Sequence, residues 1–360
     1  MTSALDFSYE SRPGRVVFRA GAAVSATPGE AERLGLRRVL VVCGSRGADT
    51  ARAVADALGP ACAGVHDRAR MHVPAEVADA AVQAARALGA DGCVAVGGGS
   101  SIGLGKAVAL RTGLPLIAVP STYSGSEMTS VWGLTENGVK HTGRDAKVLP
   151  RSVVYDPELT LSLPVPLSVT SGVNAIAHAV EALYAPDTSP LIALMAEEGV
   201  RAMAGALPAV ASDPASRAAR GRALYGAWLC GSCLGATTMG LHHKLCHVLG
   251  GTFGLPHAET HTVVLPYALA YNASAAPEAA AAVARALDAA DAPTALWELA
   301  GRLGAPRSLA ELGLTEADLA TAAEQATNQP YANPRPVTAD GVLAVLRAAH
   351  EGAPPATVAG

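Results

Sequence analysis

Aromatic and charged residues are scarce in this 360-residue chain. Phe, Trp and Tyr make up 4% of it and Asp, Glu, Lys and Arg 16%, while hydrophobic residues make up 50%. The formal net charge of −4 lacks the basic excess typical of nucleic-acid binding, so we expect no nucleic-acid partner. A chain of this length with this much apolar material is expected to fold into two domains.

Membrane and secretion signals are also missing. No run reaches the roughly 18 apolar residues that span a bilayer, and Met1–Arg19 lacks the apolar centre of a signal peptide. The six cysteines are scattered through apolar runs and do not form a compact disulfide framework. Cys230 and Cys233 have redox spacing, but the apolar helical run around them favours a structural role. We therefore expect a cytoplasmic protein with free thiols and no membrane partner.

The first 160 residues alternate between short apolar runs and amphipathic segments. Residues 38–43 and 92–96 are typical of strands buried on both faces of a parallel sheet, and helical patterns follow them. This alternation predicts a doubly wound α/β domain over residues 1–160, and residues 161–360 predict an all-helical domain. Four prolines are expected to break its helices: Pro186, Pro208, Pro256 and Pro293.

Three glycines and a serine, Gly97, Gly98, Gly99 and Ser100, follow the strand at 92–96. We expect the next helix to begin at Leu104, so the glycines would let backbone amides approach an anion. A tight turn needs glycine too. The pattern matches neither the G-x-G-x-x-G fingerprint nor the P-loop, so the glycines alone leave both interpretations open.

Two further loops carry candidate cofactor residues. After the strand at 38–43 come Gly44, Ser45 and Arg46, with no acid to bind ribose hydroxyls, so Arg46 is free to meet a 2′-phosphate. For a nicotinamide dinucleotide, this arrangement predicts that NADPH is accepted at least comparably to NADH. The hydroxyl-rich loop 120–127 could cap a helix or contact the cofactor. Its candidates are Ser121, Thr122 and Ser126.

Five of the ten histidines lie between Gly240 and His261. His243 and His247 are four residues apart and share a helical face. Asn174 and His178 do the same upstream, so two facing helices would bring Asn174, His178, His243 and His257 together, with His247 one turn along. Solvated or hydrogen-bonded core histidines are the ordinary alternative.

Taken in order, these motifs resemble the iron-containing alcohol dehydrogenase family. They are Gly97–Ser100, Pro120–Glu127, Asp156–Leu159, Asn174–Leu183 and His243–His257. The resemblance implies an α/β NAD(P)-binding domain and an all-helical catalytic domain, the fold shared with dehydroquinate synthase. It also implies a homodimer. By motif, the family's metal ligands fall on Asn174, His178, His243 and His257, and its active-site histidine falls on His247.

Two residues depart from the family pattern. Asn174 stands where the family has its only anionic ligand, and Gly103 stands where metal-dependent relatives usually have aspartate. Both changes resemble the branch of the family that reduces maleylacetate, a dicarboxylate, to 3-oxoadipate in aromatic compound degradation. We predict that no metal is required. If a metal is bound, the three imidazoles of His178, His243 and His257 would hold it, and zinc tolerates such a set.

The resemblance and the chemistry together assign roles. Hydride addition to an enone produces an enolate, which needs a cationic or hydrogen-bonding group and a proton. The predicted catalytic residues are His247 (the proton donor), His243, His178 and Lys140, although Lys140 could equally be a solvated lysine. The predicted substrate-binding residues are His257, Asn174 and His242. A metal-dependent alcohol or aldehyde dehydrogenase of the same fold, or a catalytically silent NAD(P)-binding protein, remains as an alternative.

Overall fold

The computed structural model describes residues 7, 9, 14–136 and 139–355, apart from the side chains of Val139 and Lys140. The chain divides into two compact units between Leu163 and Pro164. In the part of the chain that the structure describes, no helix combines the length and the apolarity that a membrane span requires.

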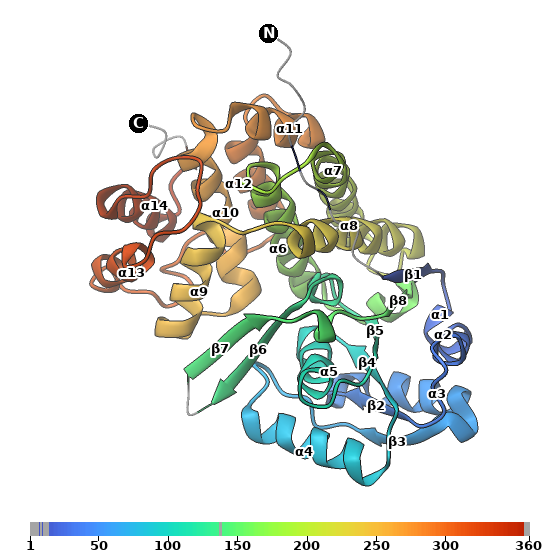
Figure 1. Cartoon of the computed structure of the whole chain (residues 1–360). Coiled ribbons are helices and arrows are strands. Elements are labelled where there is room, and N and C mark those ends of the chain that lie inside the picture. Colours follow the sequence, from blue (N-terminus) through green and yellow to red (C-terminus); the bar gives the residue numbers. More distant parts are fainter. Residues whose placement is uncertain (1–6, 8, 10–13, 137–138, 356–360) are drawn as a thin grey trace. The chain divides into compact units, whose positions relative to one another are not determined.

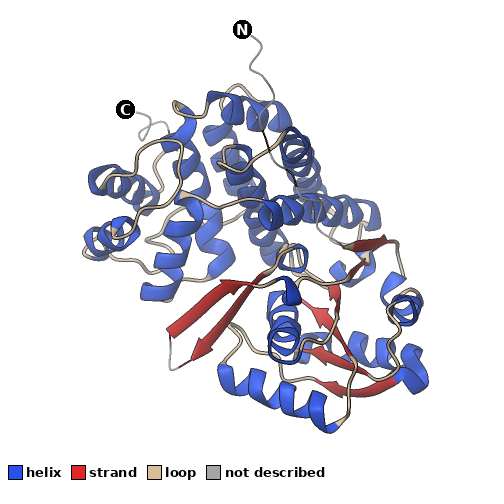
Figure 2. Ribbon diagram, viewed as in Figure 1, coloured by secondary structure: helices blue, strands red, loops and turns tan. Residues whose placement is uncertain are grey.

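The N-terminal unit is built on a six-stranded parallel sheet with the order β1-β8-β5-β4-β2-β3 (Figures 1 and 2). Its strands are β1 (Arg15–Phe18), β2 (Val39–Cys43), β3 (Cys62–His66), β4 (Gly92–Gly97), β5 (Leu116–Pro120) and β8 (Ser152–Tyr155). Its helices are α1 (Ala22–Ser25), α2 (Thr27–Arg33), α3 (Ala48–Leu58), α4 (Ala75–Ala87) and α5 (Gly99–Thr112).

Both faces of this sheet are covered, as the continuous apolar runs predict. Every residue of β2, β4 and β5 is buried. Alternate residues such as Val39, Val41 and Cys43 join a core with Ala51 and Val54 of α3. Figure 1 shows α1, α2 and α3 on one side of the sheet and α5 on the other. The predicted doubly wound α/β unit is confirmed.

The order of the strands reverses between β2 and β4. From β2 the chain moves outward to β3, then crosses back over β2 to β4 and continues to β5. In open parallel sheets, ligands bind outside the carboxyl ends of the strands at such a reversal. The segments that follow β2 and β4 are therefore the expected binding position, and both carry predicted cofactor residues.

A separate antiparallel hairpin, β6 (Val131–Glu136) and β7 (Val139–Arg144), follows β5 (Figure 2). Two other features of this unit differ from what the sequence predicts. The helix after the glycines begins at Gly99 and not at Leu104. Strand β3 is unpredicted because it is an edge strand that is only half-buried and contains Gly64, so its hydrophobic pattern is weak.

The C-terminal unit is entirely helical, as predicted. Its helices are α6 (Val165–Leu183), α7 (Pro190–Ser212), α8 (Arg217–Ala236), α9 (Leu241–Phe253), α10 (His257–Ala273), α11 (Pro277–Leu287), α12 (Ala292–Arg302), α13 (Asp318–Thr327) and α14 (Ala339–Glu351). Helix α6 packs against α7, α8 and α10 and is buried over most of its circumference. Residues of α9, α10, α13 and α14 share one hydrophobic core.

Three of the four prolines predicted to break helices lie between helices or at the beginning of one, and the fourth does not. Pro186 lies in the segment between α6 and α7, Pro256 precedes α10, and Pro293 lies in the first turn of α12. Pro208 does not break a helix as predicted but lies inside α7. Packing of α7 against α6 and α8 maintains the helix although the proline removes one backbone donor. Cys230 and Cys233 are free and buried in α8, and burial raises the pKa of both thiols, which agrees with a structural role.

Candidate active site

Loops of the α/β unit meet at the carboxyl ends of β2, β4 and β5. The Gly44 amide donates a 3.2 Å hydrogen bond to Ser101 Oγ, and the Ser121 amide donates a 3.1 Å hydrogen bond to the Gly97 carbonyl. The segments that carry the predicted cofactor residues are therefore joined. We call these residues the cofactor cradle: Gly44, Ser45, Arg46, Gly97, Gly98, Gly99, Ser100, Ser121, Thr122 and Ser126.

Two glycines of the cradle allow this close approach. Gly97 has a φ of +132°, and a Cβ there would lie 2.6 Å from Ser101 Oγ. A Cβ on Gly98 would lie 2.9 Å from Thr122 Cγ2. A side chain at either position would push the loops apart. The two interpretations of the glycines are thus compatible, because the tight turn is what exposes the backbone amides.

Helix α5 begins inside the cradle. Its N-cap residue is Gly98, and no side-chain cap hydrogen bond is made there among the described residues. The amides of the first turn and the helix dipole therefore favour an anion at this position. Thr122 Oγ1 is buried and has no hydrogen-bond partner among the described residues. An uncapped helix start beside a buried hydroxyl fits the pyrophosphate of a dinucleotide.

The space beside Gly103 is filled by another residue. A Cβ on Gly103 would lie 2.7 Å from Val73 Cγ2. Val73 belongs to a segment in which His72 and Val73 both have positive φ, which is strained for a β-branched residue. Hydrogen bonds from Thr135 of β6 to the carbonyls of both residues hold the segment in place. An aspartate at 103 would therefore require this segment to move.

Six imidazoles gather in the helical unit, and we call them the histidine cluster. They are His178 on α6, His242, His243 and His247 on α9, and His257 and His261 on α10. Ring centroids lie 5.0 Å apart for His178 and His243, 5.0 Å for His243 and His261, 6.3 Å for His243 and His247, and 4.3 Å for His257 and His261. His247 and His257 are exposed and the other four are buried. All five predicted site histidines belong to this cluster.

Sequence reasoning missed two members of this site. His261 is four residues after His257 and therefore lies on the same helical face, so the spacing that identified the other histidines could have identified it. Glu181 is three residues after His178 and is 0% exposed. Its position on α6 places it one turn beyond His178, which the same spacing rule indicates.

The Glu181 carboxylate joins α6 to the beginning of α9. It accepts hydrogen bonds from the backbone amides of Gly240 and His242 at 2.9 and 2.8 Å, and from His243 Nδ1 at 2.7 Å. Burial raises its pKa, but the hydrogen bond and charge of His243 outweigh burial and lower the pKa to about 2. Glu181 is therefore a permanently charged anion at the positive end of α9.

This anion fixes the proton positions in two imidazoles. Because a carboxylate only accepts, His243 Nδ1 donates to Glu181. When His243 is neutral, its Nε2 is therefore the acceptor for His178 Nδ1, which lies 2.9 Å away. A neutral His178 consequently carries its hydrogen on Nδ1 and its lone pair on Nε2. The chain from Glu181 to His178 sets the tautomers of both rings.

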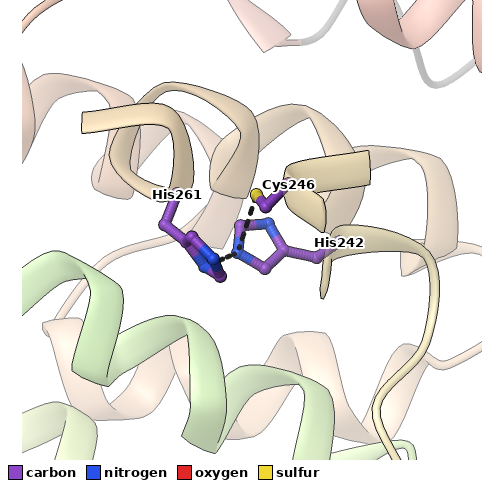
Figure 3. A group of neighbouring side chains, drawn as sticks. All are labelled: His242, Cys246 and His261. Atoms are coloured by element: carbon purple, nitrogen blue, oxygen red, sulfur yellow. Dashed lines mark hydrogen bonds between the residues drawn. The ribbon is translucent and has the colours of Figure 1, made fainter. Parts of the chain in front are cut away.

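His242, His261 and Cys246 form a second group inside the cluster (Figure 3). His242 Nε2 and His261 Nδ1 are 2.9 Å apart, and Cys246 Sγ is 3.8 Å from His242 Nε2. Two nitrogens bound to one tetrahedral zinc would lie about 3.3 Å apart. The shorter distance between His242 and His261 is that of a hydrogen bond and not that of two ligands of one metal ion. Burial lowers the pKa of His242 to about 3 and that of His261 well below its usual value, so both rings are neutral.

Two predicted site residues stand apart from these contacts. Asn174 is buried one turn before His178 on α6, and its Oδ1 has no hydrogen-bond partner among the described residues. Its part in substrate binding stays a prediction. The backbone of Lys140 pairs with Thr135 in the hairpin, but its side chain lies outside the described residues.

A glycine turn for an anion on a parallel sheet, followed by a helical unit with a buried histidine cluster, defines a class of two-unit dehydrogenases. Comparison with known proteins supports this class. Residues 13–157 match the iron-containing alcohol dehydrogenase model, and residues 168–350 match the model for the C-terminal part of the Fe-containing alcohol dehydrogenase family. The chain belongs to the iron-containing alcohol dehydrogenase family and is an oxidoreductase.

Individual relatives are similar over nearly their whole length. A maleylacetate reductase of Burkholderia cepacia is 54% identical over 97% of this chain and 99% of the relative. The crystal structure of maleylacetate reductase from Agrobacterium tumefaciens has a TM-score of 0.95 and 51% identity, covering 98% of this chain and 100% of that one. A putative alcohol dehydrogenase from Ralstonia eutropha JMP134 has a TM-score of 0.96 and 56% identity, with 98% and 100% covered.

The residues of this chain do not fit the iron that the family name implies. Iron sites of this type include a carboxylate ligand, and position 174 supplies only a neutral amide. The Glu181 carboxylate is already hydrogen-bonded to two backbone amides and to His243. In addition, His243 Nε2 is hydrogen-bonded to His178 and does not point at an open position.

Proposed function

We propose that this protein reduces maleylacetate to 3-oxoadipate with NADH or NADPH, as a step in aromatic compound degradation. The observation that carries the proposal is the similarity of more than 50% identity, over almost the full chain, to maleylacetate reductases. The histidine cluster beside a neutral residue at 174 supports the same substrate, since a carboxylate there would repel a dicarboxylate. A metal-dependent alcohol dehydrogenase of the same fold is not favoured.

The reaction transfers a hydride from the reduced nicotinamide to the alkene carbon β to the ketone. The alkene bonding pair moves toward the ketone and forms an enolate, and a proton then adds at the neighbouring carbon, leaving 3-oxoadipate and oxidised cofactor. We assign that proton to His247, because it is exposed and its charged form is hydrated. His243 and His178 bind the substrate and its enolate, and His257, Asn174 and His242 contribute to substrate binding.

Buried and exposed imidazoles have separate tasks in this proposal. His242 and His261 are fully buried and neutral, so they donate or accept hydrogen bonds without adding charge. The exposed His247 and His257 are the positions where a positive charge is hydrated and can meet a substrate carboxylate. Lys140 is proposed as a further cation for the substrate or the nicotinamide.

The cofactor cradle is proposed to bind the dinucleotide. Its glycines and the start of α5 would hold the pyrophosphate, and the hydroxyls of Ser121, Thr122 and Ser126 would contact phosphate or ribose. Arg46 is exposed after β2 and would meet the 2′-phosphate of NADPH. No metal is proposed in the reaction. A homodimer in the cytoplasm, without nucleic-acid or membrane partners, completes the proposal.

Loss of NADH absorbance with maleylacetate tests the function directly. Metal-analysed protein is assayed with and without EDTA, and in parallel with NADPH. We expect turnover with both cofactors that EDTA leaves unchanged. Absence of turnover with maleylacetate would refute the function. Turnover that EDTA abolishes and zinc or iron restores would refute only the proposal that no metal is required.

A further inference from the structure

Lys106 is a charged side chain inside the α/β unit that the proposed reaction does not use. It lies on α5, two helical turns after Gly99, and is 1% exposed. Its Nζ is 2.9 Å from the Thr129 carbonyl, 2.9 Å from Thr129 Oγ1 and 2.7 Å from the Val131 carbonyl. All three acceptors belong to the segment that leads from the cradle loop after β5 into the hairpin.

These contacts require the ammonium form of Lys106. The Thr129 hydroxyl donates its hydrogen to the Ser126 carbonyl at 3.1 Å, so it can only accept from Lys106. The other two partners are carbonyls. An ammonium has three hydrogens for three acceptors, whereas a neutral amine has two hydrogens and a lone pair that would face an oxygen. One acceptor would then be left buried and unsatisfied.

The same segment has a second buried contact, near its middle. Glu127 is 0% exposed, and its Oε1 accepts a 2.9 Å hydrogen bond from Tyr155 of β8. The upstream end is held where the Ser121 amide bonds to Gly97. Residues 121–131 are thus fastened at Ser121 to the glycine turn, at Glu127 to the sheet and at Thr129 and Val131 to α5.

We propose that Lys106 is a positioning residue for the cofactor, whose ammonium holds the loop after β5 and the start of the hairpin against the helix that begins in the cradle. The inference rests on the proposed cofactor binding. It does not place Lys106 in contact with the cofactor. Its effect is to keep the hydroxyls of Ser121, Thr122 and Ser126 in register with the first turn of α5.

The charge on Lys106 depends on pH near neutrality. Burial lowers its pKa to about 7, the Glu127 carboxylate raises it, and the Arg144 guanidinium on β7 lowers it. Burial also raises the pKa of Glu127, while the hydrogen bond from Tyr155 and the charge of Lys106 lower it. Tyr155 stays neutral because burial raises its pKa well above its usual value. As pH rises above about 7, Lys106 loses its proton, the loop loses one donor and cofactor binding weakens.

Fluorescence titration of NADH into the whole protein tests this proposal. NADH is used because, unlike NADPH, it has no group that titrates between pH 6 and pH 9. We expect the wild-type Kd to rise about tenfold over this range, which corresponds to one hydrogen bond from a charged donor. Lys106→Met should bind about tenfold more weakly at pH 6 and show no further change with pH. Lys147→Met, at an exposed position, is the matched control and should behave as wild type.

Amide hydrogen exchange without cofactor gives a second readout. Residues 126–131 should exchange faster in Lys106→Met than in wild type, and faster in wild type at pH 9 than the intrinsic rate accounts for. If Lys106→Met does not fold, Thr129→Val replaces it, because this change keeps the side-chain volume and both carbonyl acceptors. We expect its Kd for NADH to be two- to threefold weaker than that of wild type. Wild-type Kd, pH profile and exchange in the folded variants would overturn the role of Lys106. A wild-type protein that binds neither NADH nor NADPH would refute cofactor binding instead, while the exchange data still decide whether Lys106 holds the loop.

Discussion

Glu181 in the helical unit and Lys106 in the α/β unit are both almost completely buried charges, yet their surroundings treat them differently. Burial opposes the charged form of each. For Glu181, hydrogen bonds and neighbouring imidazoles reverse this effect and lower its pKa to about 2. For Lys106, burial prevails and its pKa falls to about 7. One charge is permanent, and the other responds to pH within the physiological range.

The difference follows from where the partners come from. Glu181 receives amides from the first turn of α9, where helix dipoles add together, and an imidazole that can itself carry charge. Lys106 receives two carbonyls and a hydroxyl from a loop, which supply no aligned dipole. A helix end can therefore maintain a buried charge that a loop cannot. In this proposal, the permanent charge of Glu181 holds the histidine cluster in place, and the pH-dependent charge of Lys106 changes how firmly the loops of the cofactor cradle are held.

The largest expected effect is at His247, an exposed member of the histidine cluster. His247→Ala should lower kcat about 10²- to 10⁴-fold, since it removes the proposed proton donor. The measurement is steady-state NADH oxidation with saturating maleylacetate. His350→Gln on α14, where the native ring contacts only the Leu314 carbonyl among its described hydrogen bonds, is the control. A His247→Ala enzyme within a few-fold of wild type would remove His247 from the mechanism.

Removing the charge of Glu181 should have the next largest effect on kcat. In Glu181→Gln, either orientation of the amide places its NH₂ against backbone donors, because both carboxylate oxygens accept from the start of α9. The His243 tautomer is then no longer fixed. We expect kcat to fall about 10- to 100-fold, the scale of small misplacements in an active site. KM should change less than kcat. An unchanged kcat in a folded variant would show that the tautomers do not depend on Glu181.

Local periodicity in the sequence was sufficient to find most of the histidine cluster, because α6, α9 and α10 are regular helices. It did not find Glu181 as an anchor, since its backbone partners are about 60 residues away in sequence and helical spacing does not describe a helix end. Lys106 was missed for the same reason. A lysine among apolar residues suggests a side chain that reaches solvent, and only the fold supplies its three buried acceptors.

The glycine-rich segments show the limits of propensity. Low helix propensity at Gly99–Gly103 predicts a loop, but the helix starts at Gly99 because the turn from β4 and packing on the sheet outweigh about 1 kcal/mol per glycine. The sequence identified Gly103 as unusual through its resemblance to a family. It could not show that Val73, thirty residues earlier, fills the space of the missing side chain.

The two buried charges also predict stability changes in different pH windows. Folded Glu181 binds fewer protons than unfolded Glu181 below about pH 4.5, so its contribution is present above that pH and is lost as pH falls toward 2. Folded Lys106 binds fewer protons than the unfolded lysine between about pH 7 and about pH 10.4. Its contribution therefore rises with pH, by about 1 kcal/mol per unit.

Urea unfolding of wild type against each variant measures these windows. The free-energy difference from Lys106→Met should increase between pH 7 and pH 9, and the difference from Glu181→Gln should decrease between pH 5.5 and pH 4. Global stability and order in the loop after β5 would then change in opposite directions above pH 7. Differences that stay flat in both ranges would contradict the comparison of the two charges.

The smallest expected effect is at the exposed cation of the cradle. Arg46→Ala should weaken NADPH binding about fivefold and leave NADH binding unchanged, because an exposed ion pair contributes at most about 1 kcal/mol. The control is Arg52→Ala, whose guanidinium pairs with Asp49 at the surface. The dependence on salt concentration distinguishes the effect of this exposed charge from the effects of the buried charges. The Arg46 effect should disappear at about 1 M salt, where the Debye length is about 3 Å, whereas the effect of Lys106→Met on NADH should persist, because its partners exclude water and counterions. Equal NADPH affinity at low salt would mean that the cradle recognises NADPH without Arg46.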